Sequence, residues 1–393
     1  MVRTTSRGSV SGTGREPGPI RVLFSCAGRR VGLIECFRRA GEALGRAVEV
    51  IATDVDPDLS TACHVADRAF AVPPCGDPAF VEMTLALCRD LGVELLVPTI
   101  DPELMPLALA APRFRQVGTR VLVGHPEAIA VARDKGRTAR VLADAGVPVP
   151  RTGDVADAIA NPDEWDWPLI AKPAAGSASR GLVTAHFPDA LPTGTREPYI
   201  VQTHLSGPEY TVNVFLQAGR PGGVGIVAVP HLRMSVRAGE VEKGRTERRE
   251  DLIALARAVC AALPGLAAGA HGAAGAGRAT PGSGVFCFQV IDDPAHGPRV
   301  FEINARFGGG YPLADRAGAS FARWLLEETV DRRCRPRDDW REGVTMLRYD
   351  AALFEEGTPA QVAAPRRGAR PPALAPAAGN GPARDEAALV GHG

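Results

Sequence analysis

Short apolar runs and amphipathic helical patterns alternate between residues 20 and 125. The apolar runs occupy residues 20–26, 48–54, 68–72, 94–99 and 120–124, and the helical patterns include residues 31–44 and 79–92. Strand, helix and strand in succession form a βαβ unit, so this alternation predicts an open parallel sheet of the α/β class. No G-x-G-x-x-G follows the first run, so a dinucleotide cofactor is not expected.

Polar residues follow three of these runs, at the sheet edge where α/β proteins bind their ligands. The adjacent arginines after the first run favour a site for an anionic substrate. The Asp-Pro pairs at 56–57 and 101–102 are explained equally well as helix starts, because Asp caps a helix and Pro fits its first turn. The polar residues are Gly28, Arg29 and Arg30 after the first run, Asp54 and Asp56 after the second, and Thr99, Asp101 and Glu103 after the fourth.

The composition favours a small-molecule partner over nucleic acid or a membrane. The formal net charge of the 393 residues is zero, which gives no long-range field to attract a polyanion. No apolar run approaches the roughly 20 residues of a spanning helix and no hydrophobic signal core is present, so a cytoplasmic protein is expected.

The eight cysteines form no CxxC pair and are interpreted as reduced thiols. Residues rich in Ala, Gly, Pro and Arg predict two disordered tails and one flexible insertion, at 1–19, 357–393 and 263–284.

Lysine is rare in this chain. Only Lys135, Lys172 and Lys243 occur among 45 basic residues, and arginine supplies the rest. A compact ammonium that contacts a phosphate oxygen is not always replaceable by a planar guanidinium, so the three lysines are candidates for chemistry. Chance survival on the surface is the alternative for any one of them.

A loop of small residues follows Lys172. Residues 167–185 read as strand, loop and strand, and the small residues would let backbone N–H groups approach an anion closely. The loop is not a P-loop, because it lacks GK[ST] and a following helix. An ordinary turn is the alternative explanation. The small residues are Gly176, Ser177, Ser179 and Gly181.

Residues 284–306 predict a hairpin with one apolar and one polar face. If Gln289 faces Glu302, alternation places Phe286, Phe288, Val290, Phe301, Ile303 and Ala305 on the core side. The other side then carries Gln289, Glu302, Asn304 and Arg306. A few oxygen ligands, with positions left for phosphate and water, are what Mg²⁺ prefers in nucleotide sites. A solvent-facing edge hairpin is the alternative, although it leaves the three glycines at 308–310 unexplained.

These features occur in an order that resembles the ATP-grasp superfamily, and most closely its carbamoyl-phosphate-synthase-like and PylC-like single-chain carboxylate–amine ligases. The likeness rests on Lys135, AKP at 171–173 with its GSASRG loop, VQTHLSGPEYTV at 201–212, Gln289 and EINARFGGG at 302–310. It implies an N-terminal Rossmann-like preATP-grasp domain over 20–125 and an ATP-grasp domain of two α+β subdomains over 126–356. The small subdomain would occupy about residues 150–205.

The resemblance also implies residue roles, with ATP and Mg²⁺ as cofactors and Mn²⁺ as an alternative metal. Lys135, Lys172 and the loop at 176–181 would contact phosphates, Gln202, Thr203 and Leu205 would hold adenine, and Glu209 would accept from ribose. His231 would be a further residue that binds the nucleotide. Gln289, Glu302 and Asn304 would bind the metal. Arg306, Arg237 and Lys243 would be catalytic. Gly28, Arg29, Arg30, Asp101, Glu103, Gly308, Gly309 and Gly310 would face the substrates.

The implied reaction joins a small-molecule carboxylate and an amine into an amide or peptide bond through an acyl phosphate. An amino acid or another small metabolite would be the substrate, and a homodimer is compatible with the family. Two other functions stay open on the sequence. One is ATP-dependent activation of bicarbonate or carbamate, and the other is a nucleotide-binding module without catalysis.

Overall fold

The computed structural model describes residues 18–176, 181–217, 225–237, 239–266, 284–330 and 334–354. Nearly all of the two expected tails and most of the expected insertion at 263–284 lie outside the described residues, as do the loop residues Ser177 and Ser179. Within the described residues, no helix is both long and apolar enough to cross a membrane.

The N-terminal part folds around a five-stranded parallel sheet with strand order β3-β2-β1-β4-β5. Strand β4 is buried along its whole length, and β1 in all but one residue, as expected for strands covered by helices on both faces. The predicted α/β class is therefore confirmed. The strands are β1 (Ile20–Ser25), β2 (Val48–Asp54), β3 (Arg68–Ala71), β4 (Leu95–Pro98) and β5 (Arg120–Val121). The helices are α1 (Val31–Leu44), α2 (Thr61–Val65), α3 (Ala79–Leu91) and α4 (Asp101–Gln116), with a 3-10 helix η1 (Pro57–Leu59).

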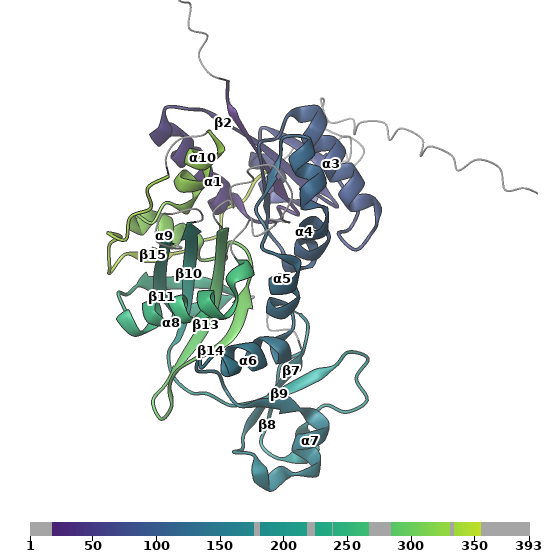
Figure 1. Ribbon diagram of the computed structural model, residues 1–393, viewed down its shortest axis with the longest axis vertical. Coiled ribbons are helices and arrows are strands. Elements are labelled where there is room, and N and C mark those ends of the chain that lie inside the picture. Colours follow the sequence, from purple (N-terminus) through teal and green to yellow (C-terminus); the bar gives the residue numbers. More distant parts are fainter. Residues whose placement is uncertain are drawn as a thin grey trace, which may run out of the picture.

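Two helices lead from this sheet to a small antiparallel sheet, at the bottom of Figure 1. The small sheet has the order β6-β9-β7-β8 and a core of its own that centres on Trp165. The connecting helices are α5 (Pro126–Ala132) and α6 (Lys135–Asp144). The small sheet consists of β6 (Thr152–Asp154), β7 (Leu169–Pro173), β8 (Val183–Ala185) and β9 (Tyr199–Thr203), with α7 (Val155–Ala160), η2 (Pro162–Glu164) and η3 (Pro188–Ala190) beside it.

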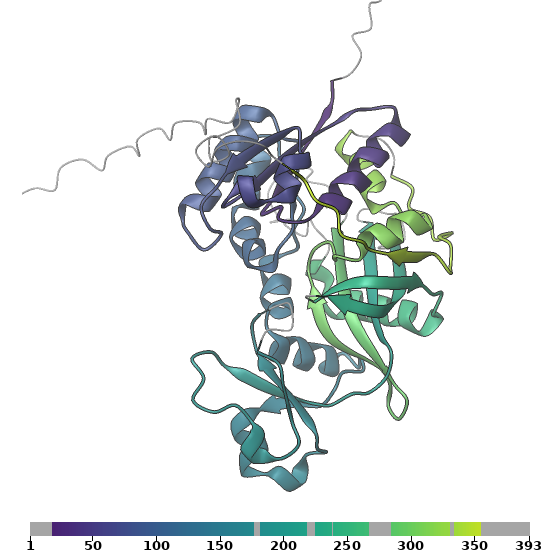
Figure 2. The ribbon, with the colours of Figure 1, turned by 180° about the vertical axis from the view of Figure 1, so that it is seen from behind.

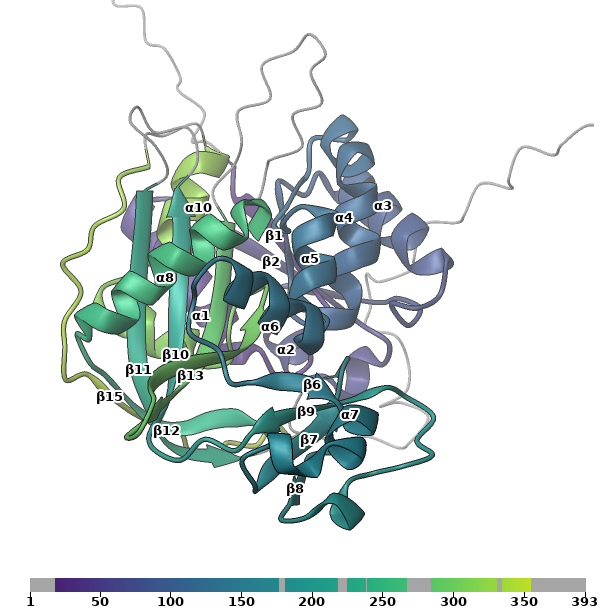
Figure 3. The ribbon, with the colours of Figure 1, turned by 60° about the horizontal axis from the view of Figure 1, so that its bottom comes forward.

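A larger antiparallel sheet, with the order β14-β13-β10-β11-β12-β15, forms the rest of the molecule. Helix α8 (Glu250–Ala262) lies across β10 and β11 (Figure 3) and contacts both. The 3-10 helix η4 (Pro264–Leu266) follows it. The strands are β10 (Glu209–Gln217), β11 (Gly225–Arg237), β12 (Glu240–Thr246), β13 (Gly284–Asp293), β14 (Gly297–Asn304) and β15 (Thr345–Leu347).

The last two helices join the large sheet to the N-terminal sheet. Helices α9 (Tyr311–Ala317) and α10 (Phe321–Thr329) both pack on α1. Aromatic rings connect the two sides, because Phe37 lies edge-on to both Phe24 and Phe307, at centroid distances of 5.2 and 5.9 Å. The two sheets therefore share one continuous core. Seen from behind in Figure 2, the yellow C-terminal segment leaves β15 and crosses toward the N-terminal sheet.

The hairpin of β13 and β14 has the predicted pairing with one exception. Gln289 does face Glu302, but a β-bulge follows, and the next pair is Val290 with Val300. The bulge leaves Phe301 unpaired and turns it toward the cavity described below. The prediction that Phe301 lies on the core side is wrong for this reason, because an extra residue in one strand reverses the alternation beyond it.

Candidate active site

A cavity of about 690 Å³ is lined by residues of the small and large sheets and by residues that follow β1 and β4 of the N-terminal sheet. That volume suits a nucleotide or a pair of small molecules. Most of the residues selected from the sequence line it. They are Arg29, Arg30, Asp101, Lys135, Lys172, Gly176, Gln202, Thr203, Leu205, Glu209, Gln289, Glu302, Asn304, Arg306, Gly309 and Gly310.

Two lysines lie at the end of the cavity nearest the small sheet. Lys172, on β7, is buried, and its ammonium lies 5.2 Å from the centroid of the Phe301 ring. Burial lowers the pKa of Lys172 to about 8; the nearby charge of Lys135 also lowers it, and Glu302 opposes both. Lys135 begins α6 and donates to the carbonyl of Gly176 at 2.7 Å, which ties this helix to the loop after β7.

Strand β9 supplies the wall between the small and large sheets. Gln202 is buried and donates to the hydroxyl of Thr152 at 2.9 Å, so its amide is fixed within the small sheet. The backbone N–H of Thr203 is also engaged, with the carbonyl of Arg151. This part of the wall is therefore held by hydrogen bonds before any ligand arrives.

Oxygen-bearing side chains gather on the cavity side of β13 and β14. Glu302 and Asn304 stand at alternate positions of β14, so both face the cavity. With the Gln289 amide oriented to satisfy its neighbours, its nitrogen donates to Glu302 at 2.8 Å and its oxygen accepts from Arg233 at 3.0 Å. Arg233 also donates to Glu209 and to the carbonyl of Gly239. Gln289 thus connects the β14 carboxylate to a buried cation.

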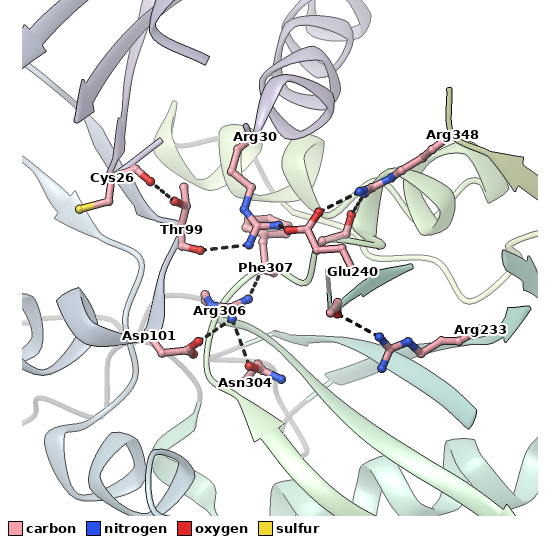
Figure 4. A network of polar contacts seen from close by, with 12 residues as sticks. Cys26, Arg30, Thr99, Asp101, Arg233, Glu240, Asn304, Arg306, Phe307 and Arg348 are labelled. Carbon is pink, nitrogen blue, oxygen red and sulfur yellow. Dashed lines mark hydrogen bonds and ion pairs between the residues drawn. The ribbon is translucent and has the colours of Figure 1, made fainter. Parts of the chain in front are cut away.

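Arg306 links the large sheet to the N-terminal sheet (Figure 4). Its guanidinium donates to Asp101 at 2.5 Å, to the side-chain oxygen of Asn304 at 3.1 Å and to the carbonyl of Phe307 at 3.1 Å. Burial alone would lower the pKa of Arg306, but Asp101, together with Cys287 and Glu302, outweighs burial and raises that pKa.

A second ion-pair group lies beyond Arg306. Glu240 pairs with Arg30 at 3.0 Å and with Arg348 at 2.8 Å, and Arg348 donates to the carbonyl of Gly309 as well. The three charged residues come from the residue before α1, the start of β12 and the segment after β15. This end of the cavity is therefore built from segments far apart in the chain.

Two family models match the chain over these sheets. The PylC-like N-terminal domain matches residues 22–122, and the ATP-grasp domain matches residues 132–310. The chain is an ATP-grasp protein with a PylC-like N-terminal domain. The resemblance stated from the sequence is confirmed at the level of the family, and so is the prediction of an ATP-grasp enzyme fold.

This ATP-grasp protein is similar in sequence to a curated relative and similar in fold to solved structures. The carbamoyl phosphate synthase large chain of Streptomyces griseus is 38% identical over 80 residues, which cover 20% of this chain and only 7% of the relative. The biotin carboxylase domain of Hydrogenobacter thermophilus 2-oxoglutarate carboxylase, solved with MgADP, ADP and bicarbonate, is similar with a TM-score of 0.61 and 18% identity, covering 83% of this chain and 73% of that one. An L-amino acid ligase from Bacillus licheniformis gives a TM-score of 0.56 at 16% identity, covering 81% and 78%.

The three glycines after β14 have close neighbours in this ATP-grasp protein. A Cβ on Gly309 would lie 2.9 Å from the Glu240 carboxyl carbon and 3.0 Å from Arg30, and one on Gly310 would lie 2.6 Å from His231. A Cβ on Gly308 would lie 2.9 Å from the Cys287 sulfur. Such contacts leave no room for a side chain. Because the three glycines have no side chains, the loop at 308–310 can lie directly against the ion pair of Arg30 and Glu240.

Several predicted site residues do not line the cavity. His231 is fully buried under Gly310, beside Asn213, and burial lowers its pKa to about 3, so it is neutral. Gly28 donates its N–H to Asp54, and Gly181 packs against Tyr199. Gly308 is likewise outside the lining, which leaves it a packing position.

Glu103 also lies outside the cavity, and its role is structural. It is fully buried and accepts from the backbone N–H groups of Thr99 and Ile100, at 2.6 and 3.0 Å. This carboxylate caps α4, so a helix does start at the Asp-Pro pair, but its capping side chain is Glu103 and not the Asp101 that the helix-start explanation named. Asp101 begins the same helix, yet its side chain reaches Arg306.

The segment at 233–244 brings different residues to the cavity from those expected. Arg237 pairs with exposed Asp350, and Lys243 is exposed, so neither lines the cavity. Arg233 and Glu240 line it instead, and neither was selected from the sequence. Two register shifts between β11 and β12 decide which side chains face inward. The one sequence feature that could have pointed to Glu240 is its position as an acidic residue directly after Gly239, a glycine of the turn between β11 and β12.

Proposed function

We propose that this ATP-grasp protein is an ATP-dependent carboxylate–amine ligase that forms an amide bond through an acyl phosphate. The observation that carries the proposal is one cavity lined by Lys172, Glu302, Asn304 and Arg306, in which Glu302 is close enough to Lys172 to oppose the lowering of its pKa by burial and Asn304 accepts a hydrogen bond from Arg306. Phosphoryl transfer to a carboxylate requires cations for the polyphosphate, oxygen ligands for a metal and a positive charge for the anionic intermediate. Lys172, then Glu302 with Asn304, and then Arg306 would supply these groups.

The donor set fits a hard divalent cation such as Mg²⁺. Among the described residues, no group of three His, Cys, Asp or Glu side chains could hold a metal alone, so phosphate oxygens would complete the coordination. Glu302 and Asn304 would supply the protein oxygens. Gln289 would support Glu302 rather than bind the metal, because its oxygen faces Arg233. When bound, Mg²⁺ would neutralise phosphate charge during the transfer.

The chain's own residues supply positioning and charge. Lys135 and Lys172 would hold the phosphates of ATP, and the carboxylate oxygen of one substrate would attack the γ-phosphorus as ADP leaves. Arg306, fixed by Asp101 and Asn304, would stabilise the acyl phosphate. The amine then attacks the acyl carbon, phosphate departs and the amine loses a proton. The small and large sheets around the cavity would keep water from the intermediate.

Activation of bicarbonate or carbamate is the second candidate. It is favoured by the 38% identity to a carbamoyl phosphate synthase large chain. The phosphoryl transfer would be the same, with bicarbonate as the acceptor, and Arg306 would hold the smaller carboxyphosphate. The short matching segment makes this the weaker candidate, because it covers 7% of that relative.

Release of ADP tests both candidates. The full chain is supplied with Mg-ATP and a panel of paired amino acids and carboxylates, with bicarbonate as a separate arm, and products are identified by mass spectrometry. We expect ADP only with a carboxylate and an amine together, and trapping of the acyl phosphate by hydroxylamine. Glu302→Ala, Asn304→Ala and removal of the metal with EDTA should each abolish turnover.

A control on the same strand separates chemistry from folding. Arg299, on β14, does not line the cavity, so Arg299→Ala should keep turnover. Tight binding of Mg-ATP without ADP under every condition would contradict the ligase and favour a module that only binds nucleotide. ADP release that persists in Glu302→Ala would contradict the assigned metal site.

A further inference from the structure

The end of the cavity beyond Arg306 carries an excess of positive charge. Among the described residues, four arginines stand there against two carboxylates that pair with them, and Glu302 reaches Arg306 from further away, so one positive charge has no carboxylate of its own. Burial and the charges of Arg306 and Arg348 lower the pKa of Arg30, which indicates how closely the guanidiniums approach one another. An anionic ligand would relieve this excess. The arginines are Arg29, Arg30, Arg306 and Arg348, and the carboxylates are Asp101 and Glu240.

Glu240 occupies the position between two of these arginines (Figure 4). One carboxylate oxygen lies 3.0 Å from Arg30, and the other lies 2.8 Å from Arg348. Burial alone would raise the pKa of Glu240, but the two guanidiniums outweigh it and hold that pKa below its ordinary value. The carboxylate is therefore ionised, and a carboxylate from a ligand could make the same two contacts.

The ion pair can be reached from the cavity. Both Arg30 and Glu240 line it, and the Glu240 side chain is 31% exposed. Gly309 lies directly against the pair and has no side chain to cover it. Figure 4 shows Arg306 between Asn304 and this ion pair. A reacting carboxylate beside Arg306 would therefore lie closer to the proposed metal ligands than a carboxylate bound at the ion pair would.

Both arginines have a second anchor that does not involve Glu240. Arg30 donates to the carbonyl of Thr99 at 3.4 Å, and Arg348 donates to the carbonyl of Gly309. If the Glu240 side chain turned away, the two guanidiniums would still be oriented by backbone oxygens. The two backbone oxygens would therefore keep both guanidiniums in place while the carboxylate between them is exchanged.

We propose that Arg30 and Arg348 form a carboxylate-binding site that Glu240 occupies in the free protein, and that a substrate carboxylate displaces Glu240 from it. This inference rests on the proposed function, which makes the reacting carboxylate lie beside Arg306. The carboxylate bound here is then one that does not react. It belongs either to an amino acid whose amine is the acceptor or to a dicarboxylic acid that is activated at its other end.

Titration calorimetry on the full chain, without ATP, tests the exchange with three probes. These are L-alanine, succinate and L-alaninamide, which lacks a carboxylate. Glu240→Gln removes the competing charge, so the probe that binds should bind about tenfold more tightly to this variant, as expected for the loss of a charged competitor. Arg30→Met and Arg348→Met should each weaken binding by about tenfold or more. L-alaninamide should not bind.

Glu242→Gln is the matched control, because Glu242 stands two residues along β12, bonds to Ser235 and Arg237 and does not line the cavity. It should bind the probes as the wild type does. Thermal melting of each variant checks that the chain is folded, and Arg30→Lys, which keeps the charge, should retain part of the binding. Whether alanine or succinate binds identifies the source of the carboxylate.

Binding that is unchanged or weakened in Glu240→Gln would overturn the proposal and make the group a clamp. Equal binding of L-alanine and L-alaninamide, or no binding of any probe to wild type and Glu240→Gln, would overturn it too. Failure of the ligase itself has a different signature. Carboxylate binding that follows the expected order while no substrate pair releases ADP would refute the ligase and leave the carboxylate site standing.

Discussion

Arg306 and Asp101 lie 2.5 Å apart, although 205 residues separate them in the chain. The contact joins the end of β14 to the first turn of α4, so the N-terminal sheet holds a guanidinium that belongs to the ATP-grasp domain. The same guanidinium donates to Asn304, one of the proposed metal ligands. The orientation of Arg306, the proposed anion-binding group, therefore depends on a residue outside the matched ATP-grasp segment.

Asp101→Asn should lower the rate of the chemical step more than nucleotide affinity. Loss of a hydrogen bond between two charged groups costs about 1.5–3 kcal/mol, so kcat for ADP release should fall roughly tenfold to a hundredfold. The KM for ATP should change little, because Lys135 and Lys172 are intact. Steady-state kinetics measures both quantities.

The control for Asp101→Asn is an ion pair that is open to solvent. Glu82 and Arg113 lie 2.6 Å apart with both side chains about half exposed, and such pairs contribute little. Glu82→Gln should therefore leave kcat and KM unchanged. A raised KM for ATP with an unchanged kcat in Asp101→Asn would instead indicate that Arg306 binds the nucleotide and not the reaction intermediate.

The affinity for ATP should depend on pH through Lys172. Burial lowers the pKa of this ammonium to about 8, so it is protonated below that pH and neutral above it in the free protein. A protonated lysine attracts the polyphosphate. The dissociation constant for ATP should thus rise as the pH rises from about 7 to about 9.5, by at most about tenfold per unit.

A variant that stays charged checks this assignment. Lys172→Arg carries a guanidinium that does not titrate in this range, so its affinity for ATP should show a flatter pH profile than the wild type. Equilibrium binding of a fluorescent ATP analogue gives both profiles. Affinity that stays constant to about pH 9.5 in the wild type would show that Lys172 does not hold the phosphates.

The small sheet should unfold before the rest of the molecule when Trp165 is removed. Trp165 is buried in a core of few members, which is separate from the large core. Replacing a buried tryptophan by alanine lowers the free energy of unfolding by about 3–5 kcal/mol. We expect this loss to exceed the local stability of so small a core. In Trp165→Ala, hydrogen exchange should quicken in β7 and β9 while β1 and β4 stay protected.

Trp340→Ala is the matched control for that measurement. Both tryptophans are buried with an arginine 4.2 Å above the ring, but Trp340 packs against the large core. Its removal should leave protection of β7 and β9 unchanged. Equal loss of protection in all three sheets of Trp165→Ala would mean that the small sheet is not a separate unit.

Much of the fold could be predicted because its signals are local. The pattern over residues 31–44 gave both ends of α1, and the apolar runs gave the parallel strands, since a strand buried on both faces is apolar throughout. Lys172 could be identified because lysine is so rare here. These inferences needed only neighbouring residues or composition.

The rest of the site depends on features that do not show in the sequence. Glu240 faces the cavity beyond two register shifts between β11 and β12, and Phe301 faces it at a bulge. Arg348 reaches Gly309 from 39 residues further along, in a segment without any motif. Periodicity cannot predict such contacts, because a shift of one residue reverses every side chain beyond it.

Gly309→Ala should impair catalysis while the chain stays folded. The new Cβ would lie 2.9 Å from the carboxyl carbon of Glu240 and 3.0 Å from Arg30, so the ion pair must move, and with it the loop that follows Arg306. Overpacking of this kind costs about 1–3 kcal/mol, which corresponds to a fall in kcat of roughly fivefold to a hundredfold if the strain falls on the reacting geometry. Gly76→Ala is the control, because nothing lies within 4 Å of its Cβ position. Steady-state ADP release and thermal melting, measured on both variants, separate a displaced ion pair from a damaged fold. A normal kcat in Gly309→Ala would mean that the pair can shift without disturbing the reaction.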